Sequence, residues 1–222
     1  MGKFTQQELD EVNKTLSTPE DCLKWAFDNL HPKLAKASSF GAEDAAIIDM
    51  MFKINSDSRL FTLETGRLPK ETFDAIEQVE QRYNTKIEKL YPDPNEVEKM
   101  IEEKGLNCFY DSIENRKLCC GIRKVHPMNK MLATLDGWIT GLRNDQNQNR
   151  SGASMLEIDE MHGNIVKVNP LVNWTFDETW DYVKSNNCPY NKLLDQGYPS
   201  ICLLYTSPSP RDQRGSRMPS SA

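Results

Sequence analysis

The chain has 222 residues, a formal net charge of −6 at pH 7 and six cysteines. This length suits one domain with a buried core, and the acidic balance argues against nucleic acid as a partner. No stretch approaches the roughly 18 apolar residues that cross a bilayer, and the amino terminus lacks a signal-peptide core. The cysteines are spaced irregularly, unlike a secreted disulfide framework. We therefore expect a cytoplasmic protein that binds neither membranes nor nucleic acid.

Apolar residues recur at helical and strand spacing along most of the chain. Amphipathic helices are expected over residues 5–31, 45–54, 69–83, 94–104, 119–135 and 175–183. Short strands are expected over residues 34–39, 59–63, 85–91, 138–142 and 165–168. Strands that alternate with helices predict an α/β fold, with an open parallel sheet and helices on both faces.

The carboxyl-terminal segment differs in kind from the rest. Residues 207–222 have almost no apolar content and no periodicity, which predicts disorder. The segment also resembles peptide strings that arise when sequencing-adapter DNA is translated, so we expect the natural sequence to depart from it near Ile201 or Cys202. A genuine disordered tail is the alternative. Residues 1–201 are then one domain, and residues 202–222 lie outside it.

Two adjacent cysteines, Cys119 and Cys120, lie in a positively charged segment. Neighbouring cysteines rarely bond to each other, because the small ring strains the peptide and the disulfide geometry. Cationic neighbours stabilise thiolates and an anionic centre, and here they are Arg116, Lys117, Arg123 and Lys124. The pair is thus a candidate set of metal ligands. The alternative is two small residues that pack on a helix.

Three predicted strand exits carry glycine, hydroxyl or cationic side chains. They are Ser38–Asp44, Leu63–Arg67 and Trp138–Arg143, with Arg150 seven residues further on. In open parallel sheets ligands bind at the carboxyl ends of the strands, where the start of a helix offers backbone N–H groups to an anion. Each feature alone is consistent with a turn or a solvated arginine. Together they predict one site for an anionic, phosphate-bearing or sulfate-bearing ligand.

These motifs together resemble the sulfonucleotide reductases, which comprise thioredoxin-dependent adenylylsulfate (APS) reductases and their phosphoadenylylsulfate (PAPS) relatives. The resemblance runs over about residues 20–201 and includes Phe109–Cys120, Lys167–Leu171 and Asp195–Ile201. It implies an adenine-nucleotide alpha-hydrolase-like, Rossmann-like sheet. The cysteine pair is similar to that of the APS branch, which carries a [4Fe–4S] cluster.

The resemblance implies a role for each matching residue. Cys119 and Cys120 would ligate two irons of the cluster, and Lys124 would reach toward both cluster and substrate. Arg143 and Arg150 are candidates for the phosphosulfate group. The adenosine part would be held by Ser38, Ser39, Phe40, Gly41, Asp44, Leu63, Thr65, Gly66 and Arg67.

The family's reaction uses a carboxyl-terminal cysteine that attacks the phosphosulfate sulfur and releases AMP. Thioredoxin or glutaredoxin then reduces the S-sulfocysteine and releases sulfite. This chain lacks the family's second Cys-x-x-Cys and its Glu-Cys-Gly motif, so we expect an incomplete, inactive copy of an assimilatory APS reductase. The alternatives are a PAPS reductase and a non-catalytic nucleotide-binding module. A homo-oligomer is compatible with each.

Overall fold

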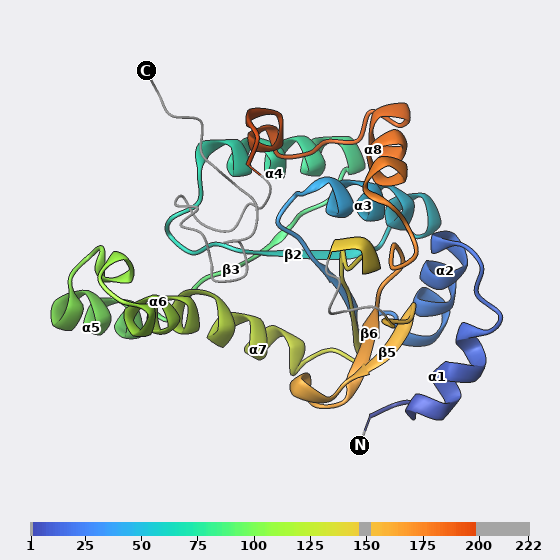
Figure 1. Ribbon diagram of the computed structural model, residues 1–222, viewed down its shortest axis with the longest axis horizontal. Helices are drawn as coiled ribbons and strands as arrows, with labels where there is room; N and C mark the ends of the chain where they lie inside the picture. Colours follow the sequence, from blue (N-terminus) through green and yellow to red (C-terminus); the bar gives the residue numbers. More distant parts are fainter. Residues whose placement is uncertain (1, 147–151, 199–222) are drawn as a thin grey trace.

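A six-stranded sheet forms the centre of the protein, whose computed structural model describes residues 2–146 and 152–198 (Figure 1). The strand order is β3-β2-β1-β4-β6-β5. The strands are β1 (Leu34–Ala37), β2 (Arg59–Leu63), β3 (Glu88–Leu90), β4 (Gly137–Ile139), β5 (Leu156–Asp159) and β6 (Ile165–Val168). All neighbouring pairs are parallel except β5 with β6. The expected α/β class is confirmed, with one antiparallel edge strand that the sequence analysis missed.

Helices cover both faces of this sheet. They are α1 (Gln6–Asn13), α2 (Pro19–Leu30), α3 (Ala42–Ile54), α4 (Lys70–Tyr83), α5 (Pro94–Lys104), α6 (Ile113–Cys120), α7 (His126–Leu132) and α8 (Phe176–Ser185). Helices α2, α3 and α8 share one apolar core with β6, and α4 packs beside α3 against Leu60 of β2. Helix α7 packs on the opposite face, against Ala35 and Phe61 (Figure 1).

The start of each amino-terminal helix follows from local capping. Thr5 and Thr18 each accept a hydrogen bond from the third residue of the helix, and the acidic side chain of that residue bonds back to the cap. Pro19 occupies the first position of α2, where its missing N–H costs nothing. The one or two helices expected over residues 5–31 are therefore two.

The segment with the two cysteines departs from expectation. A single helix was predicted over residues 119–135, but Cys119 and Cys120 are the last residues of α6, and a π-helical turn at Gly121–Val125 separates them from α7. The backbone N–H of His126 donates to the Gly121 carbonyl, and Pro127 has no N–H to donate. Proline at this position explains why the regular ladder is interrupted.

A buried carboxylate joins three of the helices that cover one face of the sheet. Asp49 of α3 accepts hydrogen bonds from the hydroxyls of Tyr83 (2.9 Å) and Tyr182 (3.0 Å), and Lys53 lies 2.6 Å from it. Burial alone would raise the pKa of Asp49, but the hydrogen bonds from Lys53, Tyr83 and Tyr182 hold it below its ordinary value. Helices α3, α4 and α8 are thereby fixed to one another.

We expect Asp49→Asn to lower the free energy of unfolding by about 2–3 kcal/mol at pH 7, since hydrogen bonds to a charged group weaken. Urea denaturation measures it. Because the folded-state pKa is depressed, this stabilisation is present above the unfolded pKa of about 3.9 and is lost as the pH falls below it. Wild type and variant should therefore converge in acid. Lys53→Met is the control: its side chain is half exposed, so it should cost under about 1 kcal/mol. Equal costs would contradict the interpretation.

Candidate functional site

A cavity of about 380 Å³ lies where the carboxyl ends of β1, β2 and β4 meet. Its lining includes Lys36 of β1, Ser38 and Ser39 of the loop after it, Asp44 of α3, Thr65 after β2, and Lys124, which precedes β4 in the chain. The convergence follows from the parallel pairing of β1 with both β2 and β4, which brings their carboxyl ends to one edge. The structure thus joins residues from all three predicted strand exits, with Ser38, Leu63 and Thr140 among them, and Lys124 in one cavity.

The loop after β1 is organised by the Asp44 carboxylate. Asp44 accepts hydrogen bonds from the backbone N–H of Ser39 (2.7 Å) and from the hydroxyls of Ser39 (3.2 Å) and Ser38 (3.3 Å). It also forms an ion pair with Lys36. Burial alone would raise the pKa of Asp44, but the Lys36 charge and these hydrogen bonds lower it. Asp44 is therefore an ionised anchor that shapes the loop from within.

Phe40 and Gly41 take roles other than those expected of them. The backbone of Phe40 has a positive φ of 63°, whereas Gly41 has an ordinary φ of −67° at the amino end of α3. The Phe40 side chain is fully buried and packs in the core with Ile48 and Leu60. The Phe40 N–H donates to the Ser38 hydroxyl (3.0 Å) and its carbonyl accepts from the Asn191 N–H (2.9 Å), so a contact of Phe40 with a ligand stays a prediction.

The loop after β2 turns away from the cavity at its end. Leu63 and Thr65 line the cavity, and the positive φ of Gly66 (72°) lets the chain turn. Arg67 donates to the carbonyl of Leu106 and lies 4.9 Å from the ring centre of Phe109. Arg67 does not line the cavity described above. Its expected contact with a ligand stays a prediction.

Arg123 connects this loop to the cysteine segment. Its Nη1 donates to the Thr65 carbonyl at 2.6 Å, and it lies 3.4 Å from where a side chain at Gly66 would begin. The guanidinium is buried, and its Nε has no hydrogen-bond partner among the described residues. Sequence analysis placed Arg123 beside the cysteines but missed its bond to the second loop. The two segments are far apart in the sequence, so no local pattern marks that contact.

Arg143 is buried and held by two carboxylates. Its Nε lies 3.0 Å from Glu43, at the start of α3, and its Nη1 lies 2.6 Å from Asp145. Asp145 also accepts from the backbone N–H of Phe176, the first residue of α8. The guanidinium expected to bind phosphosulfate is therefore already paired in this conformation. Arg150, its predicted companion, lies outside the described residues, as do Cys202 and the predicted disordered tail.

The cysteine pair borders the cavity through Lys124. Cys119 is buried and Cys120 is partly exposed, and Lys124 also lines the cavity. Burial lowers the pKa of Lys124, while the charges of Cys120 and Cys119 oppose the shift. Cys22, Cys108 and Cys188 are also buried.

The donors for a metal cluster are incomplete in the part of the chain that the structure describes. No group of three or more His, Cys, Asp or Glu side chains in residues 2–146 and 152–198 could hold a metal ion. A cubane cluster takes four thiolates, of which Cys119 and Cys120 would be two. The cationic surroundings and the unpaired Nε of Arg123 suit an anionic sulfur centre, so the described residues fit half of such a site.

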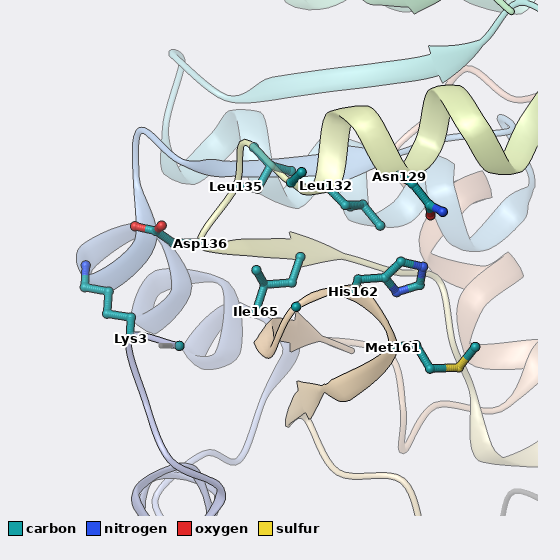
Figure 2. A pocket seen from close by; sticks show the side chains of 11 residues that line it. Lys3, Asn129, Leu132, Leu135, Asp136, Met161, His162 and Ile165 are labelled. Atoms are coloured by element: carbon teal, nitrogen blue, oxygen red, sulfur yellow. The ribbon is translucent and has the colours of Figure 1, made fainter.

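Two further cavities lie along the sheet. One of about 900 Å³ shares Ser39, Asp44 and Trp138 with the cavity above and extends along β5. The other, of about 490 Å³, lies beside the amino ends of β4 and β6. Figure 2 shows Lys3 and Asp136 on one side of it and Asn129 and His162 on the other, with Leu132 between. None of the substrate-binding or metal-binding residues predicted from the sequence lines this last cavity.

No helix in the described ranges is long and apolar enough to span a bilayer.

Comparison with known proteins identifies relatives over most of the chain. Residues 33–208 match the phosphoadenosine phosphosulfate reductase domain. Adenosine 5'-phosphosulfate reductase 2 of Bacillus subtilis is 37% identical over 219 residues, which is 97% of this chain and 87% of the relative. Adenosine 5'-phosphosulfate reductase of Burkholderia cepacia is 41% identical over 201 residues, 87% of this chain and 80% of the relative.

A solved structure extends the likeness to three dimensions. The PAPS reductase of Candida auris, in a phosphate complex, has a TM-score of 0.77 and 29% identity, and covers 90% of this chain and 96% of its own. FMN adenylyltransferase of Candida glabrata shares the fold alone, at a TM-score of 0.57 and 13% identity over 84% of this chain and 60% of its own.

Gly141 offers a direct test of the packing around the site. A Cβ at this position would lie 3.0 Å from the Glu43 Cβ and 3.3 Å from an Asp44 oxygen. We expect Gly141→Ala to lower the free energy of unfolding by about 1–3 kcal/mol, as overpacking does. Gly121→Ala is the matched control, because its nearest neighbour is 4.0 Å away and its backbone is helical. Thermal and urea unfolding measure both variants, and a neutral Gly141→Ala would refute the close approach.

Proposed function

The chain belongs to the phosphoadenosine phosphosulfate reductase family, and we propose that its substrate within that family is APS. It is accordingly an oxidoreductase that acts on a sulfur group, in sulfate assimilation. The proposed reaction converts APS to sulfite and AMP, with thioredoxin or glutaredoxin as the electron donor. Two observations support APS over PAPS: the curated relatives above are named as APS reductases, and Cys119 and Cys120 stand at the positions typical of that branch.

The observation that carries the proposed reduction of a sulfonucleotide, whether APS or PAPS, is the position of Lys124. Its side chain lines the cavity at the carboxyl ends of β1, β2 and β4, and it interacts electrostatically with Cys119 and Cys120. A ligand in the cavity is thus adjacent to the cysteine segment. When the sulfur–oxygen bond of a phosphosulfate breaks, negative charge grows on the departing phosphate oxygen. A cation held at the border of the cavity would stabilise that charge.

Arg143 and Arg150 remain our candidates for the phosphosulfate group. For Arg143 to bind it, the ligand must take the place of Glu43 or Asp145, which now pair with the guanidinium. Phosphate and sulfonate oxygens can make the same bidentate contacts as carboxylates. Arg143 would therefore keep the same kind of contact after the exchange, although Glu43 or Asp145 would lose its ion pair with Arg143.

We further propose that Cys119 and Cys120 bind two irons of a [4Fe–4S] cluster. Such a cluster would supply a polarisable charged centre beside the substrate. The buried Nε of Arg123, which lacks a partner among the described residues, is an N–H donor of the kind that stabilises cluster sulfur atoms. In this role Arg123 would hold the cysteine segment and the Leu63–Arg67 loop in a fixed relation.

A second candidate function is nucleotide binding without catalysis. It is favoured by the sequence itself, because the 222 residues contain no Glu-Cys-Gly motif to supply the nucleophile. Without a nucleophile, covalent transfer of the sulfonate cannot occur, however well the cavity binds its ligand. The printed chain would then hold APS without reducing it.

We expect the purified 222-residue protein to bind APS more tightly than PAPS and to release no sulfite in the presence of reduced thioredoxin. Isothermal titration measures the two affinities, and a sulfite assay against a blank without enzyme measures turnover. Sulfite above the blank would show that another thiol serves as nucleophile. Tighter binding of PAPS would reverse the choice of substrate, and absence of binding to either would refute the proposed function.

Anaerobic reconstitution should give less than four irons per chain, and the iron should be lost readily, because only two family ligands are present in the sequence. Iron and acid-labile sulfide analysis, with the visible spectrum, measures the loading. Cys119→Ser should abolish it, whereas Cys22→Ala, at a buried position of α2, should not. Durable loading with four irons would contradict this expectation, as would identical loading of the Cys119→Ser protein.

A further inference from the structure

Lys36 is a buried lysine in the middle of the parallel sheet. Its residues in register on the neighbouring strands are Leu60 and Ile139, both core residues, and its own exposure is 1%. Strands in the interior of a parallel sheet are normally apolar throughout. Lysine is almost never fully buried unless it is paired. This position therefore calls for an explanation, and the sequence analysis did not select it.

Stability does not provide that explanation. Lys36 forms an ion pair with Asp44, and both charges are removed from water. The desolvation of two charges commonly equals or exceeds their attraction, and apolar replacements of buried pairs are often neutral or stabilising. A buried pair that lines a ligand cavity is more readily explained by binding.

The Lys36 ammonium has a donor to spare. An ammonium carries three N–H donors. Lys36 donates to the Asp44 carboxylate and to the Ala37 carbonyl, and no third acceptor contacts it among the described residues. Asp44 in turn is occupied by Ser38 and Ser39. Lys36 is thus held in place by the loop that it helps to organise, with one N–H available at the cavity.

We infer that Lys36 donates this third N–H to an oxygen of the bound adenine nucleotide, which makes it a substrate-binding residue. The inference rests on the proposed function. The acceptor is either a phosphate oxygen or a ribose hydroxyl, since adenine has no oxygen atom. A preorganised, desolvated cation binds such an oxygen more strongly than an exposed one, because it is already out of water.

The test compares two variants that differ only at Lys36. Asp44→Asn keeps the ammonium and an acceptor for the Ser39 N–H, and Lys36→Met with Asp44→Asn removes the ammonium and leaves no unpaired charge. We expect the double variant to bind AMP roughly tenfold or more weakly than Asp44→Asn, the effect of losing a charge-assisted hydrogen bond. Lys33→Met, on an exposed side chain near the amino end of β1, should bind as wild type.

The affinity for adenosine, which has the ribose of AMP but no phosphate, distinguishes the two acceptors. Equal weakening for adenosine and AMP assigns Lys36 to a ribose hydroxyl, and weakening for AMP alone assigns it to the phosphate. Unchanged affinity for both overturns the inference. If wild type binds neither AMP nor APS, the proposed function fails instead.

A measurement on the wild-type protein covers the case in which the double variant does not fold. The dialdehyde of AMP condenses with amines beside the ribose, and an acyl phosphate of AMP acylates amines beside the phosphate. Peptide mapping should find label on Lys36 from one of the two probes, suppressed by excess AMP. Label on Lys124 without label on Lys36 overturns the inference.

Discussion

The buried Asp44 carboxylate is the interaction on which the candidate site depends. It sits in the first turn of α3 and gathers the Ser39 N–H, two serine hydroxyls and the Lys36 ammonium. Those donors come from the end of β1 and the loop after it, so one carboxylate fixes the path between strand and helix. The close approach of Gly141 brings the exit of β4 against the same turn. The end of β1, the first turn of α3 and the exit of β4, which line the cavity, are consequently packed against one another.

The second structural link runs between the β2 exit and the cysteine segment. Arg123 bonds to the Thr65 carbonyl, and the adjacent Lys124 lines the cavity. Both belong to the π-helical turn Gly121–Val125, which a regular helix would not reproduce. The extra residue in this turn changes the direction in which successive side chains leave the helix. Two neighbouring cations can therefore serve different partners: Arg123 holds a loop and Lys124 lines the cavity.

Much of this arrangement was predictable from the sequence. The alternation of strands and helices indicated the sheet, and the three strand exits indicated the edge at which the cavity lies. These features depend on local hydrophobic pattern and on the general geometry of parallel sheets. The helix start at Thr18 was likewise visible as a capping residue before Pro19.

The remaining features depend on contacts that local pattern does not encode. The positive φ falls on Phe40 and not on Gly41, because burial of the Phe40 side chain decides the loop. Glu43 pairs with Arg143 across 100 residues of sequence. Lys36 interrupts an otherwise apolar strand, and no local pattern marked it as a residue of the site. Strand β5 follows a stretch with few apolar residues. It is a strand because it pairs antiparallel with β6, a contact that the local sequence does not indicate.

The cations of the site share an electrostatic property that bears on selectivity. Lys36 is balanced by Asp44, Arg143 by Glu43 and Asp145, and Lys124 lies beside two thiols. An anion that reaches Arg143 has to compete with carboxylates that the fold already supplies, and a neutral ligand gains nothing from that exchange. If Arg143 binds the substrate as proposed, a phosphosulfate, which offers more oxygens and more charge than one carboxylate, would compete where weaker anions fail. Under the proposed function, internal pairing would lower the affinity for anions in general and favour those with the densest charge.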